Sequence, residues 1–266
     1  MRTPLYLLQN AYFICRYFLL GKAKISEEER KNVEANVTFI YKSFNRQISA
    51  KRLYRCIKQY YPMARVIISD DSMEPLKIAE LKEDDLILHL PFNSGLGKGL
   101  ADALDQVNTP YTMRMDDDEL LTPGSKIHKQ LCYLQNNDNV DLIGLQATNR
   151  YPEKMAARNK RIRMNRKLKI TAGTIIDGLE VLYKPVNVYL ARTEALRRVG
   201  FDPQIRMIDH HEFFWRAAGE IVCVQDPRAY VMHCHNLFEK DDYNRYREDI
   251  AVDVRYIATK HGADYR

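Results

Sequence analysis

The sequence predicts an α/β protein with a mostly parallel sheet and helices on its faces. Short apolar segments rich in β-branched residues alternate with longer segments of helical period along most of the chain. Acidic residues follow two of the predicted strands directly, as Asp70-Asp71 and as Asp116-Asp117-Asp118. Because ligands of such sheets bind beyond the carboxyl ends of the strands, we expect these carboxylates to share one crevice.

The composition fits one large folded domain with small appendages. The chain has 266 residues, of which 45% are hydrophobic and 29% are charged, so wholesale disorder is excluded. The net charge is +6, but the segment from Lys154 to Lys169 holds eight basic residues and no acid, which leaves −2 for the rest. That segment has no aromatic residue for base stacking, so we expect no nucleic-acid partner. Five widely spaced cysteines, mostly within apolar segments, indicate buried free thiols in a reducing compartment.

The amino-terminal segment from Leu5 to Leu20 is mostly apolar but contains Arg16. It is shorter than the roughly 20 residues that span a bilayer. Two interpretations remain, a helix packed on the domain or a helix lying in the plane of a membrane. We therefore expect a cytoplasmic protein, with a peripheral position at the inner membrane face as one alternative. Ser26-Glu27-Glu28-Glu29 then predicts a capped polar helix.

The first half of the chain reads as repeated strand–helix units. The predicted strands are Val37–Tyr41, Arg65–Ser69, Leu86–Leu90 and Tyr111–Met115, and the predicted helices end near Tyr61 and Val107. The second helix begins in Gly95-Leu96-Gly97-Lys98-Gly99, which lacks the spacing of a phosphate-binding loop. A helix-capping turn and a loop that brings Lys98 to a phosphate both fit this segment.

The second half continues the pattern with less regularity. Further strands are predicted at Asp141–Gln146, Val186–Arg192, Ile221–Val224 and Ala229–Met232, and helices at Thr193–Val199, from Asp209 and from Asp241 to His261. In the last helix, Tyr246, Ile250, Val254 and Ile257 form one apolar stripe, which we interpret as a docking face. The basic segment before Lys169 is compatible with a solvated loop, a surface for anionic lipids or a flap over a nucleotide.

The three consecutive aspartates form the most informative motif. Adjacent carboxylates repel one another, so their burial at a strand end requires a neutralising cation. Mg²⁺ or Mn²⁺ held by one or two of them, with substrate phosphates as further ligands, meets this need. A solvated acidic turn before Thr122-Pro123-Gly124 is the alternative.

A second acidic pair, Asp209 and Glu212, is spaced to lie on one face of a helix. His210 and His211 stand beside these carboxylates, but without the HxxxH or HExxH spacing of a metal site. A helix that packs its aromatic residues into the core and leaves its polar face to solvent is the alternative.

In this order the motifs resemble nucleotide-sugar glycosyltransferases of the GT-A fold, family 2-like, over about three quarters of the chain. The second half looks most like the catalytic domain of β1,4-N-acetylgalactosaminyltransferases. The residues that carry the resemblance are Lys42-Ser43-Phe44-x-Arg46, Gln59–Pro62, Ser69–Ser72, Gly97–Gly99, Asp116–Asp118, Asp141–Gly144, Asn187–Arg192, Val199–Pro203 and His210-x-Glu212-Phe213-Phe214.

The resemblance implies roles for individual residues. Asp116 to Asp118 would be the DXD motif, with Asp118 on Mn²⁺ or Mg²⁺, Asp116 and Asp117 near the donor ribose, and Asp116 as a further metal ligand. His233 would complete the metal or diphosphate site. The remaining donor-binding residues would be Lys42, Arg46, Asp71 and, near phosphate, Lys98. Glu212 would be the catalytic base, with Asp209 as its competitor because the relatives carry no acid there. The relatives' amino-terminal membrane anchor is expected to be absent.

The expected activity is therefore an inverting, metal-dependent transfer of GalNAc, GlcNAc or a hexose from a UDP-sugar to a glycan or lipid-linked acceptor. Proton removal from the acceptor and charge stabilisation on the diphosphate would use the two acidic groups separately. A nucleotidyltransferase, a non-catalytic sugar-binding protein and a nucleic-acid-binding protein are the alternatives. The expected organisation is a helical segment (1–36), a glycosyltransferase domain (37–236) and a carboxyl-terminal helix (237–266).

Overall fold

The computed structural model describes residues 24–148, 166–234, 246 and 250–262, together with residues 8, 11–13 and 15. Most of the predicted amino-terminal apolar helix and of the basic segment up to Lys169 lies outside the described residues, as does most of the tail before Ile250. In the described ranges, no helix combines the length and apolar content needed to cross a bilayer.

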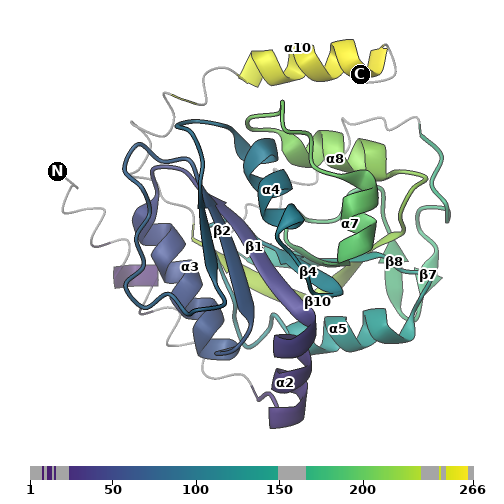
Figure 1. The fold of residues 1–266 in the computed structure, drawn as a ribbon. Helices are drawn as coiled ribbons and strands as arrows, with labels where there is room; N and C mark the ends of the chain where they lie inside the picture. Colours follow the sequence, from purple (N-terminus) through teal and green to yellow (C-terminus); the bar gives the residue numbers. More distant parts are fainter. Residues whose placement is uncertain are drawn as a thin grey trace.

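The described chain alternates strands and helices as the sequence predicts (Figure 1). The helices are α2 (Glu27–Asn36), α3 (Gln47–Tyr60), α4 (Leu96–Asp105), α5 (Ile127–Asn136), α7 (Thr193–Val199), α8 (Asp209–Ala217) and α10 (Ile250–His261). The strands are β1 (Val37–Ser43), β2 (Arg65–Asp70), β3 (Leu86–His89), β4 (Tyr111–Arg114), β5 (Glu119–Leu120), β6 (Leu142–Thr148), β7 (Ile175–Ile176), β8 (Leu179–Val181), β9 (Tyr189–Arg192) and β10 (Cys223–His233). The predicted capping box is present at α2, where Ser26 and Glu29 exchange hydrogen bonds of 2.8 and 3.2 Å.

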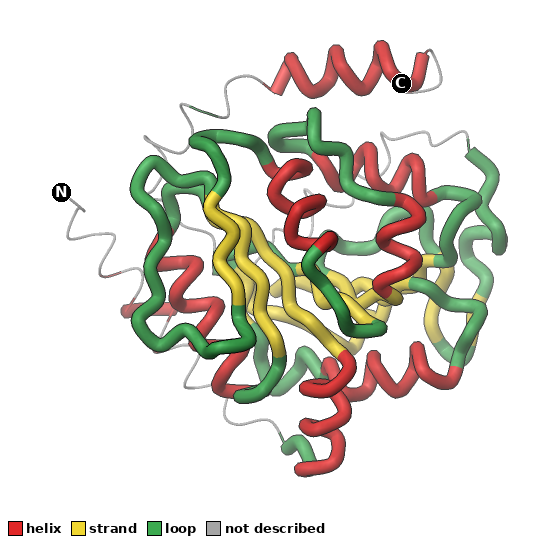
Figure 2. Tube along the Cα trace, in the orientation of Figure 1, coloured by secondary structure: helices red, strands yellow, loops and turns green. Residues whose placement is uncertain are grey.

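One mixed sheet organises the fold, and its strands run through the centre of the tube in Figure 2. The strand order is β3-β2-β1-β4-β9-β6-β10-β8-β7, with β5 paired to β10. The first four strands are mutually parallel, whereas β9 lies antiparallel between β4 and β6. The carboxyl ends of β1, β2 and β4 therefore meet at one edge, where Lys42, Asp71 and the triple aspartate lie.

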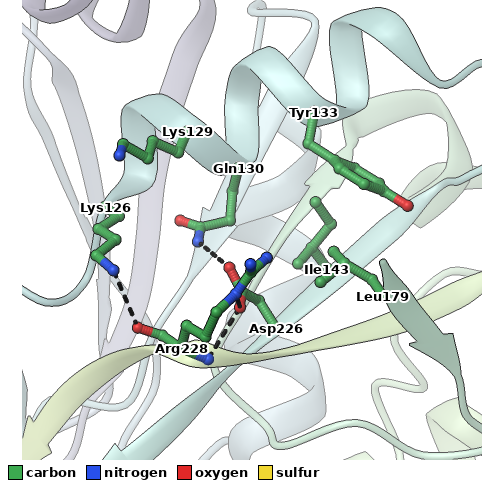
Figure 3. A pocket seen from close by; sticks show the side chains of 8 residues that line it. All are labelled: Lys126, Lys129, Gln130, Tyr133, Ile143, Leu179, Asp226 and Arg228. Atoms are coloured by element: carbon green, nitrogen blue, oxygen red, sulfur yellow. Dashed lines mark hydrogen bonds and ion pairs between the residues drawn. The ribbon is translucent and has the colours of Figure 1, made fainter. Parts of the chain in front are cut away.

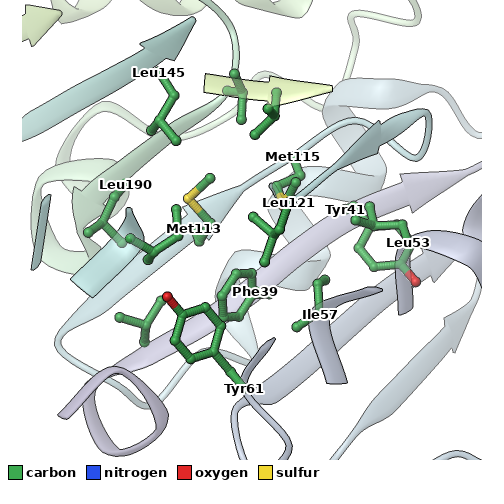
Figure 4. Close-up of a cluster of buried hydrophobic side chains, with 14 of the residues drawn as sticks. Phe39, Tyr41, Leu53, Ile57, Tyr61, Met113, Met115, Leu121, Leu145 and Leu190 are labelled. Atoms are coloured by element: carbon green, nitrogen blue, oxygen red, sulfur yellow. The ribbon is translucent and has the colours of Figure 1, made fainter. Parts of the chain in front are cut away.

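Two apolar layers hold the helices against the sheet. Neighbouring residues of β1 point to opposite faces, so Phe39 joins the layer beneath α2, α3 and α5, and Ile40 joins the layer beneath α4, α7 and α8. In the first layer Phe39 contacts the ring of Tyr61, with a centroid distance of 5.9 Å, among side chains from α3 and β4 (Figure 4). Burial on both faces explains why these strands read as continuous apolar segments.

Several predicted strands differ in extent from the observed ones. The segments Ile221–Val224 and Ala229–Met232 belong to the single strand β10, whose register against β6 shifts between Asp226 and Tyr230. That irregularity, a bulge, interrupts the apolar pattern without ending the strand. The predicted strand at Val186 begins only at Tyr189, and the hairpin of β7 and β8 was not predicted because its pairing partner β10 is distant in sequence.

The five cysteines are free, as the sequence predicts, within the part of the chain that the structure describes. Cys56, Cys223 and Cys234 are buried in the core. Cys132 and Cys15, in contrast, are exposed, so burial alone does not describe the set.

The predicted docking stripe of the carboxyl-terminal helix is wrong for two of its members. Ile250 and Val254 are 45% and 46% exposed, whereas Ile257 is buried. The helix docks instead through Asp253, whose carboxylate accepts hydrogen bonds of 3.1, 2.7 and 3.2 Å from the backbone N–H groups of residues 206–208. Three backbone donors on one buried carboxylate fix the face that α10 turns inward, so a polar contact overrides the apolar period.

The loop before α8 also packs directly on the first turn of α4. Gly97 N donates to Ile205 O at 2.9 Å, and a Cβ at Gly97 would lie 1.9 Å from Asp202 O. We expect Gly97→Ala to lower the free energy of unfolding by about 1–3 kcal/mol, because the added methyl group displaces this loop. Elsewhere in a helix the same change stabilises by about 0.5–1 kcal/mol. Urea denaturation measures the free energy of unfolding of the variant and of the unmodified chain. A variant that is more stable than the unmodified chain would contradict the close packing.

Candidate active site

The triple aspartate occupies a closed turn between β4 and β5. Asp116 N donates to a carboxylate oxygen of Glu119 at 2.9 Å, and Glu119 N returns a bond of 3.0 Å to Asp116 O. Strand β5 pairs antiparallel with β10, which sets Glu119 opposite His233, and Cys234 N donates to Asp118 O at 2.6 Å. This pairing brings the His233 Nε2 atom to 3.5 Å from Asp118 Oδ2. The structure thus joins two of the residues predicted to bind metal.

Two arginines pair with the three carboxylates and offset two of their three charges. Arg46, at the start of α3, contacts Asp117 at 2.7 Å and Asp118 at 2.9 Å. Arg114, the last residue of β4, contacts Asp116 at 2.7 Å. Burial of this cluster was predicted to need a cation, and two guanidinium groups of the described residues supply part of that positive charge. Arg46 was expected near the nucleotide, and the structure places it on the carboxylates of Asp117 and Asp118.

Arg114 is the site residue that the sequence analysis missed. Its side chain is fully buried, and the carbonyl oxygen of Asn187 accepts a hydrogen bond from it. Burial disfavours its charge, but Asp116 and Asp209 outweigh burial and raise the pKa of the guanidinium above its ordinary value. An arginine inside an apolar strand, directly before an acidic triplet, was the available signal, because such a charge is buried only with partners.

A metal ion at this site would have two protein ligands. Among the described residues, no three acidic, histidine or cysteine side chains are arranged to hold a metal by themselves. Asp118 and His233 offer a carboxylate oxygen and an imidazole nitrogen, while Asp116, also predicted as a ligand, faces Arg114. Such a pair fits Mn²⁺ or Mg²⁺ that takes its other ligands from a substrate diphosphate.

The carboxyl ends of β1 and β2 form the second part of the site. Lys42 and Asp71 make a buried ion pair, and Asp71 also accepts a hydrogen bond of 3.0 Å from Gly95 N. Burial lowers the pKa of Lys42, although Asp71 acts in the opposite direction. Lys98, in contrast, pairs with Asp102 on the exposed side of α4, and no ion pair of the described residues joins it to the aspartates.

Three aromatic rings stand beside the Lys42–Asp71 pair. Phe44, Phe92 and Tyr246 have ring centroids 5.3 to 5.7 Å apart, and the Lys42 ammonium lies 5.2 Å from the Phe44 centroid. Phe44 belongs to the motif that carries the resemblance, whereas no pattern in the sequence indicated that Phe92 and Tyr246 would join it. Together the rings provide an apolar wall next to buried charges.

Helix α8 sends its two acidic residues in different directions. Asp209 lies 3.9 Å from Arg114 Nη2 and so belongs to the aspartate cluster. Glu212 is instead enclosed by Arg216 at 2.6 Å, Lys260 at 2.9 Å and His261 at 3.0 Å. Burial opposes the ionisation of Glu212, but these hydrogen bonds outweigh it and hold its pKa below the ordinary value. The predicted base Glu212 is thus not brought to the other site residues.

Two aromatic residues of α8 pack into the core, as the alternative interpretation held, but its polar face is not left to solvent because Asp209 and Glu212 are buried. Phe213 and Phe214 are buried against Tyr189, with centroid distances of 6.1 and 6.0 Å. Trp215 is half-buried, and its ring lies 4.0 Å from that of His261 on α10. Core packing on one side and α10 on the other therefore fix the orientation of α8.

A separate pocket lies between α5 and strands β8 and β10 (Figure 3). It is lined by Lys126, Lys129, Gln130, Tyr133, Ile143, Leu179, Asp226 and Arg228. Asp226 is already bound there by Gln130 at 3.1 Å and by the Arg228 backbone N–H at 2.9 Å. The pocket contains none of the residues predicted to bind donor or metal, so the candidate site is the cluster at the strand ends.

Comparison with known proteins agrees with the family that the motifs resemble. The chain is 32% identical to mouse (Mus musculus) β-1,4 N-acetylgalactosaminyltransferase 2, over 82% of its own length and 44% of the relative. It is 28% identical to the human (Homo sapiens) β-1,4 N-acetylgalactosaminyltransferase 1, over 86% of its own length and 46% of the relative. The chain thus spans about half the length of these relatives.

Solved structures show the same fold at low sequence identity. S. aureus TarS 1–349 in complex with UDP-GlcNAc matches with a TM-score of 0.54 and 14% identity, over 82% of this chain and 66% of that one. The mannosyltransferase PcManGT from Pyrobaculum calidifontis, in complex with GDP-Man and Mn²⁺, matches with a TM-score of 0.56 and 13% identity, over 97% and 74%. The fold is therefore GT-A. Residues 38–200 match the model of glycosyl transferase family 2, and the chain belongs to that family.

Proposed function

We propose that this chain transfers a sugar, with inversion, from a UDP-sugar to a glycan or lipid-linked acceptor. The observation that carries the proposal is the joint arrangement of Asp118 beside His233 and of Asp209 linked through Arg114 to Asp116. One half of this arrangement suits a diphosphate leaving group and the other suits the approach of an acceptor. The sugar is GalNAc, GlcNAc or a hexose, supported by the curated relatives and by the UDP-GlcNAc complex of TarS.

The nucleoside end of the donor would lie on β1 and β2. The Lys42–Asp71 pair would provide charged contacts, and Phe44 and Phe92 would provide an apolar surface for the nucleobase. Asp71 is the proposed uracil contact, and Lys98 stays a predicted phosphate contact. Arg46 holds Asp117 and Asp118 in fixed positions, so their carboxylates need no reorganisation when the donor arrives.

Mn²⁺ or Mg²⁺ held by Asp118 and His233 would stabilise the negative charge that grows on the diphosphate. The chain's own residues supply the rest. Arg114 pairs with Asp116 and lies beside Asp209 at the start of α8, where the base is expected. Glu212 stays a predicted base, but its three cationic partners suit it to holding α8 against α10.

A panel of UDP-sugars, each with Mn²⁺ and with EDTA, tests the proposal. We expect slow hydrolysis of one donor by the full chain with Mn²⁺, faster turnover once a saccharide or lipid-linked acceptor is added, and loss of both with EDTA. Product analysis by mass spectrometry must show a glycoside and UDP. Formation of a nucleotide-sugar from a sugar phosphate would instead identify a nucleotidyltransferase and overturn the proposal.

A further inference from the structure

Four side chains in the first turn of α8 could take a proton, and Asp209, His210 and Glu212 among them differ in accessibility. Asp209 is 3% exposed and Glu212 is fully buried. The His210 side chain is 28% exposed. A general base must come within hydrogen-bond distance of the hydroxyl that it deprotonates. Of Asp209, His210 and Glu212, His210 is the one that an acceptor can touch without movement of α8.

Asp209 is placed to support His210. Its Oδ2 atom lies 3.9 Å from Arg114 Nη2, and Arg114 is fixed by Asp116. Its Oδ1 atom has no hydrogen bond from the described residues but lies 3.6 Å from His210 Nδ1. Distances of this kind tighten when a substrate binds. A carboxylate on Nδ1 fixes the tautomer of an imidazole and leaves Nε2 to accept a proton.

We propose that His210, held by Asp209, is the catalytic base that deprotonates the acceptor hydroxyl. The assignment rests on the proposed function. His210 Nε2 takes the hydroxyl proton as the acceptor oxygen forms its bond to the sugar C1 atom. The bond from C1 to the diphosphate oxygen breaks, and its electron pair leaves with UDP. Asp209 stays ionised and stabilises the imidazolium, which then gives its proton to water.

The charge environment keeps His210 in the required form. Burial lowers its pKa, Asp209 opposes this effect, and Lys184 and Arg114 lower the pKa further, so the net direction is downward. The ring of His211, on the same helix, also faces His210, with 4.2 Å between the two ring centroids. His210 is therefore neutral at neutral pH, and the base is lost only as the pH falls through this lowered pKa.

His211 offers a matched control. It has the same chemistry and lies on the same turn, but its ring nitrogens are 3.4 Å from the Lys184 ammonium, which donates to its lone pair. A histidine engaged in this way does not suit proton abstraction. Replacement of His211 therefore reports the general cost of changing this helix surface.

The test compares His210→Gln, His211→Gln and Asp209→Asn at saturating donor, with UDP titrations beside the rates. We expect His210→Gln to lower turnover by at least about a hundredfold, with UDP affinity within a few-fold, and His211→Gln to stay within a few-fold in both. Asp209→Asn should lower turnover less and move the acidic limb of the pH profile. Added imidazole should restore activity to His210→Ala, a response that misfolding cannot produce.

Several outcomes would overturn the assignment. If His210→Gln turns over normally while Asp209→Asn or Glu212→Gln is inactive, a carboxylate is the base. A His210→Ala variant that is folded, binds UDP and gains nothing from imidazole also contradicts it. Absence of both transfer and donor hydrolysis in the unmodified chain would remove the proposed function and this role together, whereas an active unmodified chain isolates the role of His210.

Discussion

Asp118→Asn is expected to lower sugar transfer by at least about a hundredfold and to bring UDP affinity in Mn²⁺ down to the value measured in EDTA. The change keeps the shape of the side chain and removes the charge that faces both His233 and Arg46. A hard cation loses affinity when a carboxylate ligand becomes an amide. Calorimetric titration of UDP, with and without Mn²⁺, measures the coupling between metal and nucleotide.

Two controls make this experiment specific. His233→Gln should weaken the metal dependence in the same direction, because it removes the second proposed ligand without touching the arginines. Asp117→Asn removes an equal charge from Arg46, but Asp117 is not one of the two proposed metal ligands, so this variant should retain more of the metal response. Equal UDP affinity of the unmodified chain in Mn²⁺ and in EDTA would exclude a metal from donor binding.

Arg114→Met is expected to lower the free energy of unfolding by about 3–5 kcal/mol, the largest effect on stability that we predict. The guanidinium is fully buried between Asp116 and Asp209. Its removal leaves Asp209 as an uncompensated charge in the core beside Tyr189. Urea denaturation followed by circular dichroism gives the free energy, provided that the transition is two-state.

A double variant separates charge from packing. Arg114→Met alone leaves Asp209 charged and buried. Combining it with Asp209→Asn removes that charge, so the double variant should recover part of the lost free energy of unfolding. Lys31→Met, which breaks an exposed pair with Glu27 on α2, should have no measurable effect. A loss below about 1 kcal/mol for Arg114→Met would show that solvent or a local shift neutralises the aspartates.

The alternation of apolar and amphipathic segments was enough to predict the fold class and the strand ends on which Asp71 and Asp118 lie. The spacing of apolar residues within a segment indicates whether it is a strand or a helix and which face is buried, and this information lies within the segment itself. The partners of the carboxylates were not predictable in this way. Arg46 and Arg114 are separated from each other by more than sixty positions, and which cation meets which aspartate depends on the packing of α3 against the sheet.

Helix α8 illustrates the same limit at closer range. Helical spacing predicted that Asp209 and Glu212 share one face of α8, but it could not show that Asp209 meets Arg114 while α10 covers Glu212 and leaves His210 accessible. The stripe of Ile250 and Val254 was misleading for a related reason. Apolar periodicity predicts the inward face of a helix only when hydrophobic contact dominates its docking, and at α10 the buried carboxylate of Asp253 dominates.

The bonds from Asp253 to the backbone of residues 206–208 set an order of events during synthesis. The ribosome delivers α10 after all the other elements described here, at roughly 5–20 residues per second. Until then, the three backbone donors before α8 lack their carboxylate acceptor, although their loop already packs on Gly97. A nascent chain can therefore complete its sheet while the start of α8 is not yet held by α10. Vectorial synthesis thus places the docking of α10 after the formation of the sheet.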